Sequence, residues 1–328
     1  MRVSVLGTGC LGTAVAQVLT DNKHDVLLWT VDEKQVKEIN EKRTNKFYYE
    51  NFKFDEKVSA TTSLEEIVNY SDNIVVVLPS KFIKDTMKKI NKVLKNSNDK
   101  KTFINLSKGM DYKNLITISE IIEQNIDSKN INKICSMTGP TFAIEILERK
   151  ITKFIAASNI VDHLSDVKNI FQNDYILIDH SNDIKGIEIL SSVKNIIALA
   201  AGILDGLGYG ENAHAILITN GVKEMMKISP FYNIETDTIL SVSGIGDLVL
   251  TASSKTSRNY LTGQKIGKGE KIDKAIETTK TVVEGVECAK VIYKFSKEHK
   301  INLPITTAIY NIFYKGKSPK EEILKIFK

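Results

Sequence analysis

One lysine, Lys194, lies within a long apolar segment of the sequence. The segment from about Asp183 to Asp205 carries aliphatic residues mostly at helical spacing and is apolar nearly all round toward its end, which is typical of a buried helix. No acidic residue lies three or four positions from Lys194, so the helix offers it no ion-pair partner. The lysine must find a distant partner or titrate. It is therefore a candidate general acid or base, unless its charged end reaches solvent from a helix end.

A glycine-rich turn near the start of the chain predicts a dinucleotide site. Residues 7–12, GTGCLG, lie between a β-rich run and a predicted helix, 13–19. Gly7 permits the tight turn, Gly9 lets the backbone approach a pyrophosphate, and Gly12 lets the helix pack closely on the strand. The helix N-terminus would then face the phosphates.

The residues after the next predicted strand, Asp25 to Trp29, bear on the choice between NAD and NADP. Asp32 lies 20 residues past Gly12, about where a carboxylate that binds a ribose hydroxyl is expected. Asp32 also suits the first turn of a helix from Glu33 to Asn40. Lys34 remains a candidate contact for a 2′-phosphate, so the sequence only slightly favours NAD.

Two turns after predicted strands are candidates for ligand contacts. Lys108 follows the buried segment 102–106, and Gly139 and Thr141 lie in a Gly-Pro turn that opens a helix. Ligands bind at the carboxyl ends of strands in open α/β sheets. An ordinary solvated lysine and an ordinary turn are the alternatives.

Polar residues in the C-terminal half suggest a second group of contacts. Ser257, Arg258 and Asn259 combine a hydroxyl, a guanidinium and an amide, the donors that suit a phosphate. Asp247 follows a glycine-bearing turn, where it could cap a helix or orient a catalytic lysine. For residues 257–259 the alternative is a capped surface helix.

Length and composition indicate a soluble, cytoplasmic protein of two domains. The 328 residues are 42% hydrophobic, but no run of about 18 uncharged apolar residues predicts membrane insertion, and the first residues do not resemble a signal peptide. The 45 basic and 40 acidic residues are interspersed, which argues against a nucleic-acid partner. The three cysteines are far apart and show no metal-ligand spacing, so we expect free thiols and no metal.

The order of predicted elements indicates the fold class. Short β-rich segments alternate with helical ones as far as about residue 178, and the remainder is helical. This predicts an α/β domain with a mostly parallel sheet, followed by helices.

Taken together, these motifs resemble the bacterial-type NAD(P)-dependent glycerol-3-phosphate dehydrogenases, from residue 1 to about residue 310. Beyond the glycine turn, the matching segments are 79–80, 107–109, 139–145, 193–195, 244–251, 257–259 and 282–285. The resemblance implies a Rossmann-like domain over residues 1–182 and an all-α, substrate-binding domain over residues 183–328. The active site would lie between them.

The resemblance also implies an activity and a set of site residues. The activity is reversible hydride transfer from NAD(P)H to dihydroxyacetone phosphate, a small-molecule phosphate, giving sn-glycerol 3-phosphate for phospholipid synthesis. The resemblance also implies a homodimer. Lys194 would be the general acid/base, with Asp247 and Lys108 as the other catalytic residues. The expected substrate contacts are Lys108, Gly139, Thr141, Lys194, Asp247, Ser257, Arg258 and Asn259. The expected cofactor contacts are Gly7, Gly9, Cys10, Leu11, Gly12, Asp32, Lys108, Ala143, Arg258, Val282 and Glu284.

The chain departs from the family pattern at a few positions, which leaves alternatives open. Leu11 replaces a usual aromatic residue, Thr30-Val31-Asp32 lacks an arginine that is often present, and Ser191-Ser192 replaces a Gly-Ala pair. Asn220 replaces a usual arginine. A related dehydrogenase for another keto or hydroxy acid would not need residues 257–259, and a dinucleotide sensor would not need a proton donor.

Overall fold

The computed structural model describes residues 1–328 except 114, 161–163 and 279–282. The chain forms two compact units. The first, which we call the sheet unit, comprises Met1–Asp111 and Ile116–Ile184. The second, the helical unit, comprises Tyr112–Leu115 and Lys185–Lys328. The predicted domain boundary between residues 182 and 183 stays a prediction. The sequence pattern gave no indication that segment 112–115 belongs to the helical unit.

The sheet unit is built on an eight-stranded sheet in the order β12-β11-β10-β7-β6-β1-β2-β5. From β10 to β5 neighbouring strands pair in parallel, whereas β11 pairs antiparallel with β10 and in parallel with β12. The predicted mostly parallel α/β sheet is therefore confirmed. The chain builds outward from β1 through β2 to β5 and then crosses to β6, so the strand order reverses between β1 and β6. Ligands bind at such a reversal in open α/β sheets. The strands are β1 (Arg2–Leu6), β2 (Asp25–Trp29), β5 (Val58–Thr61), β6 (Asn73–Val76), β7 (Lys101–Asn105), β10 (Ile131–Thr138), β11 (Thr152–Ala157) and β12 (Ile176–Ser181).

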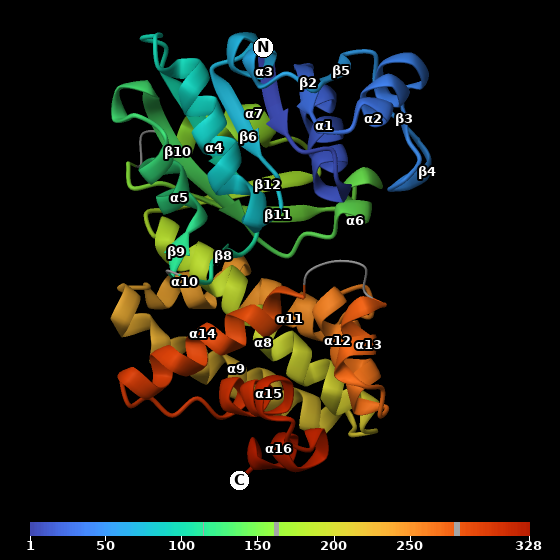
Figure 1. Cartoon of the computed structure of the whole chain (residues 1–328), viewed down its shortest axis with the longest axis vertical. Coiled ribbons are helices and arrows are strands. Elements are labelled where there is room, and N and C mark those ends of the chain that lie inside the picture. The colour runs from blue at the N-terminus through green and yellow to red at the C-terminus, as the bar shows by residue number, and fades with distance from the viewer. Residues whose placement is uncertain (114, 161–163, 279–282) are drawn as a thin grey trace. The chain divides into compact units, whose positions relative to one another are not determined.

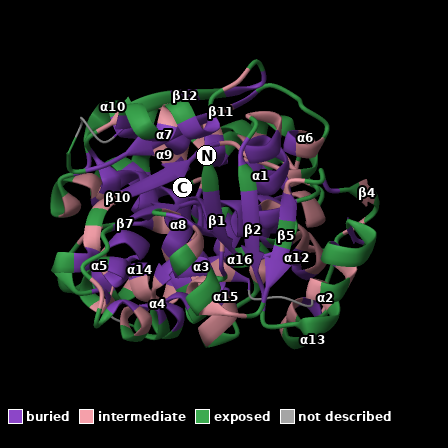
Figure 2. Cartoon of the chain, turned by 90° about the horizontal axis from the view of Figure 1, so that it is seen from above, coloured by how far each residue is buried: buried purple, intermediate pink, exposed green. Residues whose placement is uncertain are grey.

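Helices cover both faces of this sheet, which explains why its central strands are almost continuously apolar. One hydrophobic cluster joins the sheet to α3 (Leu64–Tyr70), α4 (Ser80–Leu94) and α5 (Ile118–Asn125). A second joins it to α1 (Cys10–Asp21), α6 (Ala143–Leu147) and α7 (Leu164–Phe171). The central strands are accordingly buried along most of their length (Figure 2).

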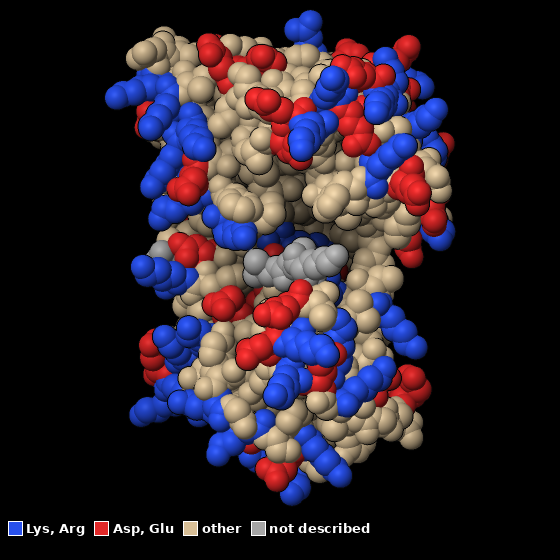
Figure 3. Space-filling view, turned by 45° about the vertical axis from the view of Figure 1, so that its right-hand side comes forward, with Lys and Arg blue, Asp and Glu red and all other residues tan. Residues whose placement is uncertain are grey.

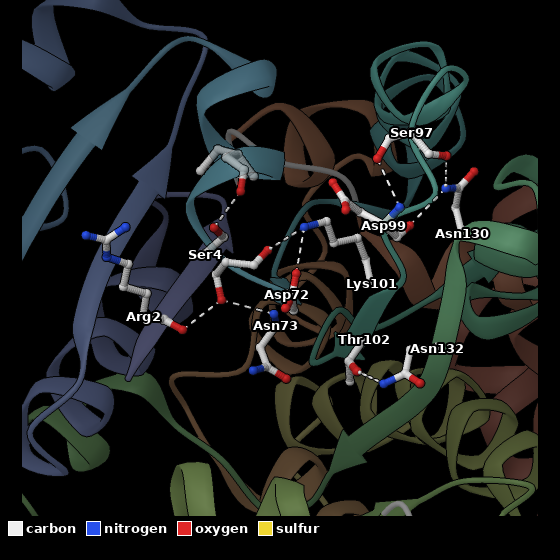
Figure 4. Close-up of polar contacts among 12 residues, drawn as sticks. Arg2, Ser4, Asp72, Asn73, Ser97, Asp99, Lys101, Thr102, Asn130 and Asn132 are labelled. Carbon is white, nitrogen blue, oxygen red and sulfur yellow. Dashed lines mark hydrogen bonds and ion pairs between the residues drawn. The ribbon is translucent and has the colours of Figure 1, made fainter.

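A polar network ties together the amino ends of the parallel strands (Figure 4). Lys101 begins β7, is only 3% exposed, and donates to Asp72 Oδ1 at 2.8 Å and to the Ser71 carbonyl oxygen at 3.3 Å. The Ser71 hydroxyl in turn donates to the Arg2 carbonyl oxygen at 2.7 Å. This buried lysine lies at the edge of the sheet opposite to the glycine turn and has a structural partner.

Two short hairpins interrupt the α/β alternation. The predicted helix 33–40 is shorter than expected, because α2 (Glu33–Lys37) continues as a π-helix over Glu38–Lys42. It is followed by a hairpin of β3 (Thr44–Asn45) and β4 (Tyr49–Lys53). The second hairpin, β8 (Met110–Asp111) and β9 (Ile116–Thr117), brackets the segment that belongs to the helical unit.

The helical unit is organised around α8 (Ile184–Gly206), the helix predicted from the apolar segment. This helix is long and apolar enough to cross a membrane, but it is buried within the protein. A π-helix covers Val242–Gly246. Among the described residues of the unit, the other α-helices, shown in yellow to red in Figure 1, are α9 (Glu211–Tyr232), α10 (Thr236–Leu240), α11 (Asp247–Ser253), α12 (Arg258–Gly267), α13 (Ile272–Glu277), α14 (Glu284–Glu298), α15 (Pro304–Lys315) and α16 (Pro319–Lys325). The predicted all-α C-terminal part is confirmed.

Glycines let α8 and α12 approach with their backbones in contact. A Cβ added to Gly202 would lie 1.9 Å from the Tyr260 carbonyl oxygen, and one added to Gly263 would lie 2.2 Å from that of Leu199. Gly206 and Gly267, one turn further along each helix, are equally close to the opposite helix. The two helices are thus held at a separation that no side chain permits.

Candidate active site

The glycine turn presents open backbone above the N-terminus of α1. Gly7 has φ +121°, and its Cβ would lie 2.7 Å from the Val77 carbonyl oxygen. A Cβ on Gly12 would lie 2.1 Å from the Gly7 carbonyl oxygen, whereas one on Gly9 would meet nothing within 4 Å. Two glycines are therefore required by the fold, and the third leaves space for a ligand. Cys10 is exposed and Leu11 half-buried, so both line the outside of the turn. This arrangement fits the pyrophosphate of a dinucleotide.

Other predicted contacts of the sheet unit follow strands that end at the same edge as β1. Lys108 is half-buried and lies just beyond β7. Gly139 and Thr141 follow β10, and Ala143 is the first residue of α6. Because β1, β6, β7 and β10 are parallel, the sheet brings these residues to one edge. A Cβ on Gly139 would lie 2.4 Å from the Lys153 carbonyl oxygen, so close strand packing also requires this glycine.

Asp32 lies after β2, where its side chain is exposed. Its Oδ1 accepts a hydrogen bond from the Lys34 backbone N–H at 2.9 Å, so the residue caps α2. Capping uses one carboxylate oxygen, and a ribose hydroxyl could be bound by the other. Asp32 can therefore cap α2 and bind a ribose hydroxyl at the same time.

Lys194 has found a distant partner within the helical unit. Its Nζ forms an ion pair with Asp247 Oδ2, and both residues are only 1% exposed. Asp247 is the first residue of α11, and its carboxylate also accepts from Thr251 Oγ1 at 3.3 Å. Lys194 does not reach the surface from a helix end. A buried lysine and carboxylate in contact form a charged pair that can hold and exchange a proton.

The triplet 257–259 begins α12 and combines capping with unused donors. Ser257 Oγ accepts from the Tyr260 N–H at 3.4 Å, which leaves its own O–H available to donate. Asn259 Oδ1 accepts from the Gly285 N–H at 3.0 Å, which leaves its amide N–H groups. Arg258 is exposed. The predicted cap and the predicted donor set therefore coexist at this helix N-terminus, where an anion is favoured.

The N-terminus of α14 packs against the helix that carries the lysine. A Cβ on Gly285 would lie 2.5 Å from the Asn195 carbonyl oxygen, and Asn195 Nδ2 donates to Glu284 Oε2 at 3.5 Å. Glu284 and Asn259 are thus both linked to segments next to Lys194. Val282 lies outside the described residues.

The predicted residues therefore form two groups, one in each unit. The group in the sheet unit lies at the carboxyl ends of β1, β2, β7 and β10, and the group in the helical unit joins α8, α11, α12 and α14. Sequence reasoning assigned no role to Asn195, although it lies in the matching segment 193–195. It also missed Gln35 and Asn45, which contact the glycine turn, because such contacts between distant residues leave no sequence pattern.

Comparisons with known proteins identify both parts of the chain. A family model described as the NAD-dependent glycerol-3-phosphate dehydrogenase N-terminus matches residues 2–163. A model described as the C-terminus of the same enzyme matches residues 183–324.

Similar proteins cover nearly the whole chain. The glycerol-3-phosphate dehydrogenase (NAD(P)+) of Ligilactobacillus salivarius is 38% identical over 98% of this chain and 95% of its own length. That of Pediococcus pentosaceus is 37% identical, with the same coverage. The crystal structure of glycerol-3-phosphate dehydrogenase from Coxiella burnetii is 26% identical, has a TM-score of 0.91, and covers 100% of this chain and 98% of that one.

Proposed function

Because the chain belongs to the NAD-dependent glycerol-3-phosphate dehydrogenase family, we propose that Lys194 is the general acid/base of its reaction. The enzyme interconverts dihydroxyacetone phosphate and sn-glycerol 3-phosphate with NAD or NADP. The nicotinamide, when bound, supplies or accepts the hydride. In reduction Lys194 gives a proton to the carbonyl oxygen, and in oxidation it takes one from the hydroxyl. The observation that carries this proposal is the buried ion pair between Lys194 and Asp247.

Asp247 and Lys108 complete the proposed catalytic set. Asp247 accepts from Lys194 and so holds its Nζ in one place, which positions the proton for transfer. Lys108 would bind an oxygen of the substrate. Gly139 and Thr141 would lie near the substrate as part of the same strand edge.

We propose that Ser257, Arg258 and Asn259 bind the substrate phosphate. The hydroxyl, guanidinium and amide can all donate, and the N-terminus of α12 adds backbone N–H groups. Replacement of Arg258 by alanine should raise KM for dihydroxyacetone phosphate by about tenfold or more. Arg258→Lys should recover only part of this loss, because an ammonium lacks the fork of guanidinium donors. An unchanged KM in Arg258→Ala would contradict the assignment.

The residues that would hold the dinucleotide are those of the glycine turn together with Asp32, Lys108, Ala143, Arg258, Val282 and Glu284. We propose a modest preference for NAD, because Asp32 presents a carboxylate that would repel a 2′-phosphate. Initial rates with NADH and with NADPH, each with dihydroxyacetone phosphate as acceptor, test both the reaction and this preference. Faster turnover with NADPH would contradict the role of Asp32, and no turnover with either would contradict the reaction.

The role of Lys194 is tested by Lys194→Met, which keeps the length of the side chain and removes the proton. We expect kcat to fall by about a hundredfold or more while NADH still binds. Lys101→Met is the matched control, because Lys101 is another buried lysine in an ion pair but lies at the opposite edge of the sheet. It should lower stability and leave kcat close to that of the wild type. Turnover at the wild-type rate in Lys194→Met would rule out the proton-transfer role.

We further propose that the product supplies phospholipid synthesis in the cytoplasm and that the enzyme is a homodimer. Two observations support the cytoplasmic location: basic and acidic side chains are interspersed on the face shown in Figure 3, and the apolar helix α8 is buried within the protein. The helical unit also exposes the apolar side chains of Ile216, Met226, Phe231 and Leu240 by 45–59%, some of which a second copy would cover. Light scattering should give twice the 36.7 kDa of one chain. Cells that lack the gene should need glycerol for growth, and normal growth without it would contradict the metabolic role.

A further inference from the structure

A buried asparagine of the β3–β4 hairpin lies directly beneath the glycine turn. Asn45, which has no exposed surface, donates from Nδ2 to the Thr8 carbonyl oxygen at 2.8 Å and to Thr13 Oγ1 at 2.9 Å. Thr8 is the second residue of the turn, and Thr13 lies in the first turn of α1. Asn45 therefore holds both the turn and the helix that follows it, from 37 residues beyond Thr8.

A second amide fixes the direction in which the Asn45 side chain faces. Gln35 Nε2 donates to Asn45 Oδ1 at 2.9 Å. Gln35 Oε1 accepts from the hydroxyl of Thr8 at 2.6 Å and from that of Thr30 at 2.9 Å. Because the Thr8 carbonyl oxygen can only accept, Asn45 must turn its Nδ2 toward it and its Oδ1 toward Gln35. The donors and acceptors of this network match in one arrangement only. Through Thr30, which follows β2, the network links the end of that strand to the glycine turn.

The hydrogen bond to Thr8 sets the direction of the next backbone N–H. A peptide group is planar and trans, so the Thr8 carbonyl and the Gly9 N–H point to opposite sides. With the Thr8 oxygen held inward by Asn45, the Gly9 N–H points outward. No acceptor for this N–H is found among the residues that the structure describes. The space above Gly9 is open, since an added Cβ would meet nothing within 4 Å.

We propose that Asn45 is a positioning residue for the dinucleotide, acting through the Gly9 amide. Its side chain holds the Thr8–Gly9 peptide so that the N–H, rather than the carbonyl oxygen, faces the pyrophosphate. Without Asn45 this peptide can turn, and the carbonyl dipole then repels the phosphates. Gln35 supports the same orientation by holding Asn45 and the Thr8 hydroxyl.

Calorimetric titration with ADP-ribose, which carries the pyrophosphate but no nicotinamide, tests this role in the variant Asn45→Leu. We expect Kd for ADP-ribose to rise by about tenfold, and KM for NADH to rise by a similar factor, with a smaller change in kcat. The matched control is Asn40→Leu. Asn40 belongs to the π-helix and makes two hydrogen bonds with the Ala60 backbone in β5, at 2.8 and 2.9 Å, rather than with the turn. Asn40 is exposed, so this control should lose less thermal stability than Asn45→Leu and keep the wild-type Kd.

A second variant keeps the proposal testable if Asn45→Leu does not fold. Gln35 is half-buried, and Gln35→Met removes its hydrogen bonds while keeping its length. It should raise Kd for ADP-ribose in the same direction, by about threefold. Wild-type affinity in the folded variants would overturn the proposal, as would an equal loss of affinity in Asn40→Leu. The titration involves no substrate, so its outcome is independent of the role of Lys194.

Discussion

A methyl group added to the glycine turn would meet different surroundings at Gly9 and at Gly12. At Gly12 it would overlap the Gly7 carbonyl oxygen, whereas at Gly9 it would enter open space. We therefore expect Gly12→Ala to lower both the melting temperature and the affinity for NADH. Gly9→Ala should lower the affinity alone, by about tenfold, because the methyl group would occupy the path of the pyrophosphate. Thermal unfolding and NADH fluorescence titration of the two variants separate these effects, and a destabilised Gly9→Ala would contradict the expectation.

At the level of single residues, sequence spacing could identify Lys194 as unusual but could not identify its partner. The absence of a helical ion pair follows from residues 190–198, whereas Asp247 lies more than 50 positions away and reaches the lysine only through the packing of α11 on α8. The same limit applies to Asn45. Local patterns describe neighbours along a helix or strand, and these contacts depend on tertiary structure.

A buried carboxylate joins two helices in the helical unit. Glu224 of α9 accepts hydrogen bonds from the backbone N–H groups of Ile305 and Thr306 and from the Thr306 hydroxyl, and so caps α15. Burial raises the pKa of Glu224 to about 7, in spite of these hydrogen bonds. A raised pKa in the folded state means that the protonated form is favoured there. The free energy of unfolding should therefore fall as pH rises from about 4.5 to 7, by roughly 3 kcal/mol from this residue.

Urea unfolding at pH 5 and pH 8 tests this prediction in Glu224→Gln, which cannot ionise. The variant should lose less stability than the wild type between the two pH values. Glu322→Gln is the control. Burial raises the pKa of Glu322, but the hydrogen bond from Asn311 and the ion pair with Lys325 lower it more, so that the pKa lies below its usual value. The contribution of Glu322 to the free energy of unfolding should therefore be lost as the pH falls. An identical pH dependence in the wild type and Glu224→Gln would exclude the predicted effect.

The contact between α8 and α12 positions two groups of site residues at once. Gly263→Ala would place a methyl group against the Leu199 carbonyl oxygen and force the helices apart, at a cost of about 1–3 kcal/mol. Because α8 carries Lys194 and α12 begins at Arg258, we expect KM for dihydroxyacetone phosphate to rise as well. Gly210→Ala is the control, since an added Cβ there meets nothing within 4 Å. Unfolding and steady-state kinetics of both variants would check this, and equal effects would argue against the close contact.

At the level of elements, the strands and the long helices were predictable because their apolar patterns are strong. The helix from Asp183 to Asp205 was placed within one residue of α8, and the glycine turn was placed between its strand and helix. The π-helix and the β3–β4 hairpin were not predicted. Both segments are only a few residues long, and the hydrogen bonds of Asn40 and Asn45 that hold them come from tertiary contacts.

At the scale of the whole molecule, Tyr112 packs with the helical unit although the segments before and after it in sequence belong to the sheet unit. Its hydroxyl is buried beside Ser192, Glu284 and Cys288 of the helical unit, and burial raises its pKa. We expect Tyr112→Ala to cost about 2 kcal/mol. Hydrogen exchange should accelerate in α8 and α14 rather than in β7 or β10, the strands of the large sheet that precede and follow Tyr112 in sequence. Phe47→Ala, a change at an aromatic side chain that is 86% exposed, is the control. Faster exchange confined to the sheet unit would contradict this prediction.

Because residues 112–115 belong to the helical unit, they also affect how the two units can be recombined with those of other proteins in evolution. A gene joined at a single point near residue 184 would pair a new helical region with a sheet region that still carries the old tetrapeptide. The recombinant would fold well only if the foreign helices accepted Tyr112 beside them. We therefore expect the two units to be exchanged less easily than a single linker would allow, because the helical unit includes four residues that lie between two segments of the sheet unit.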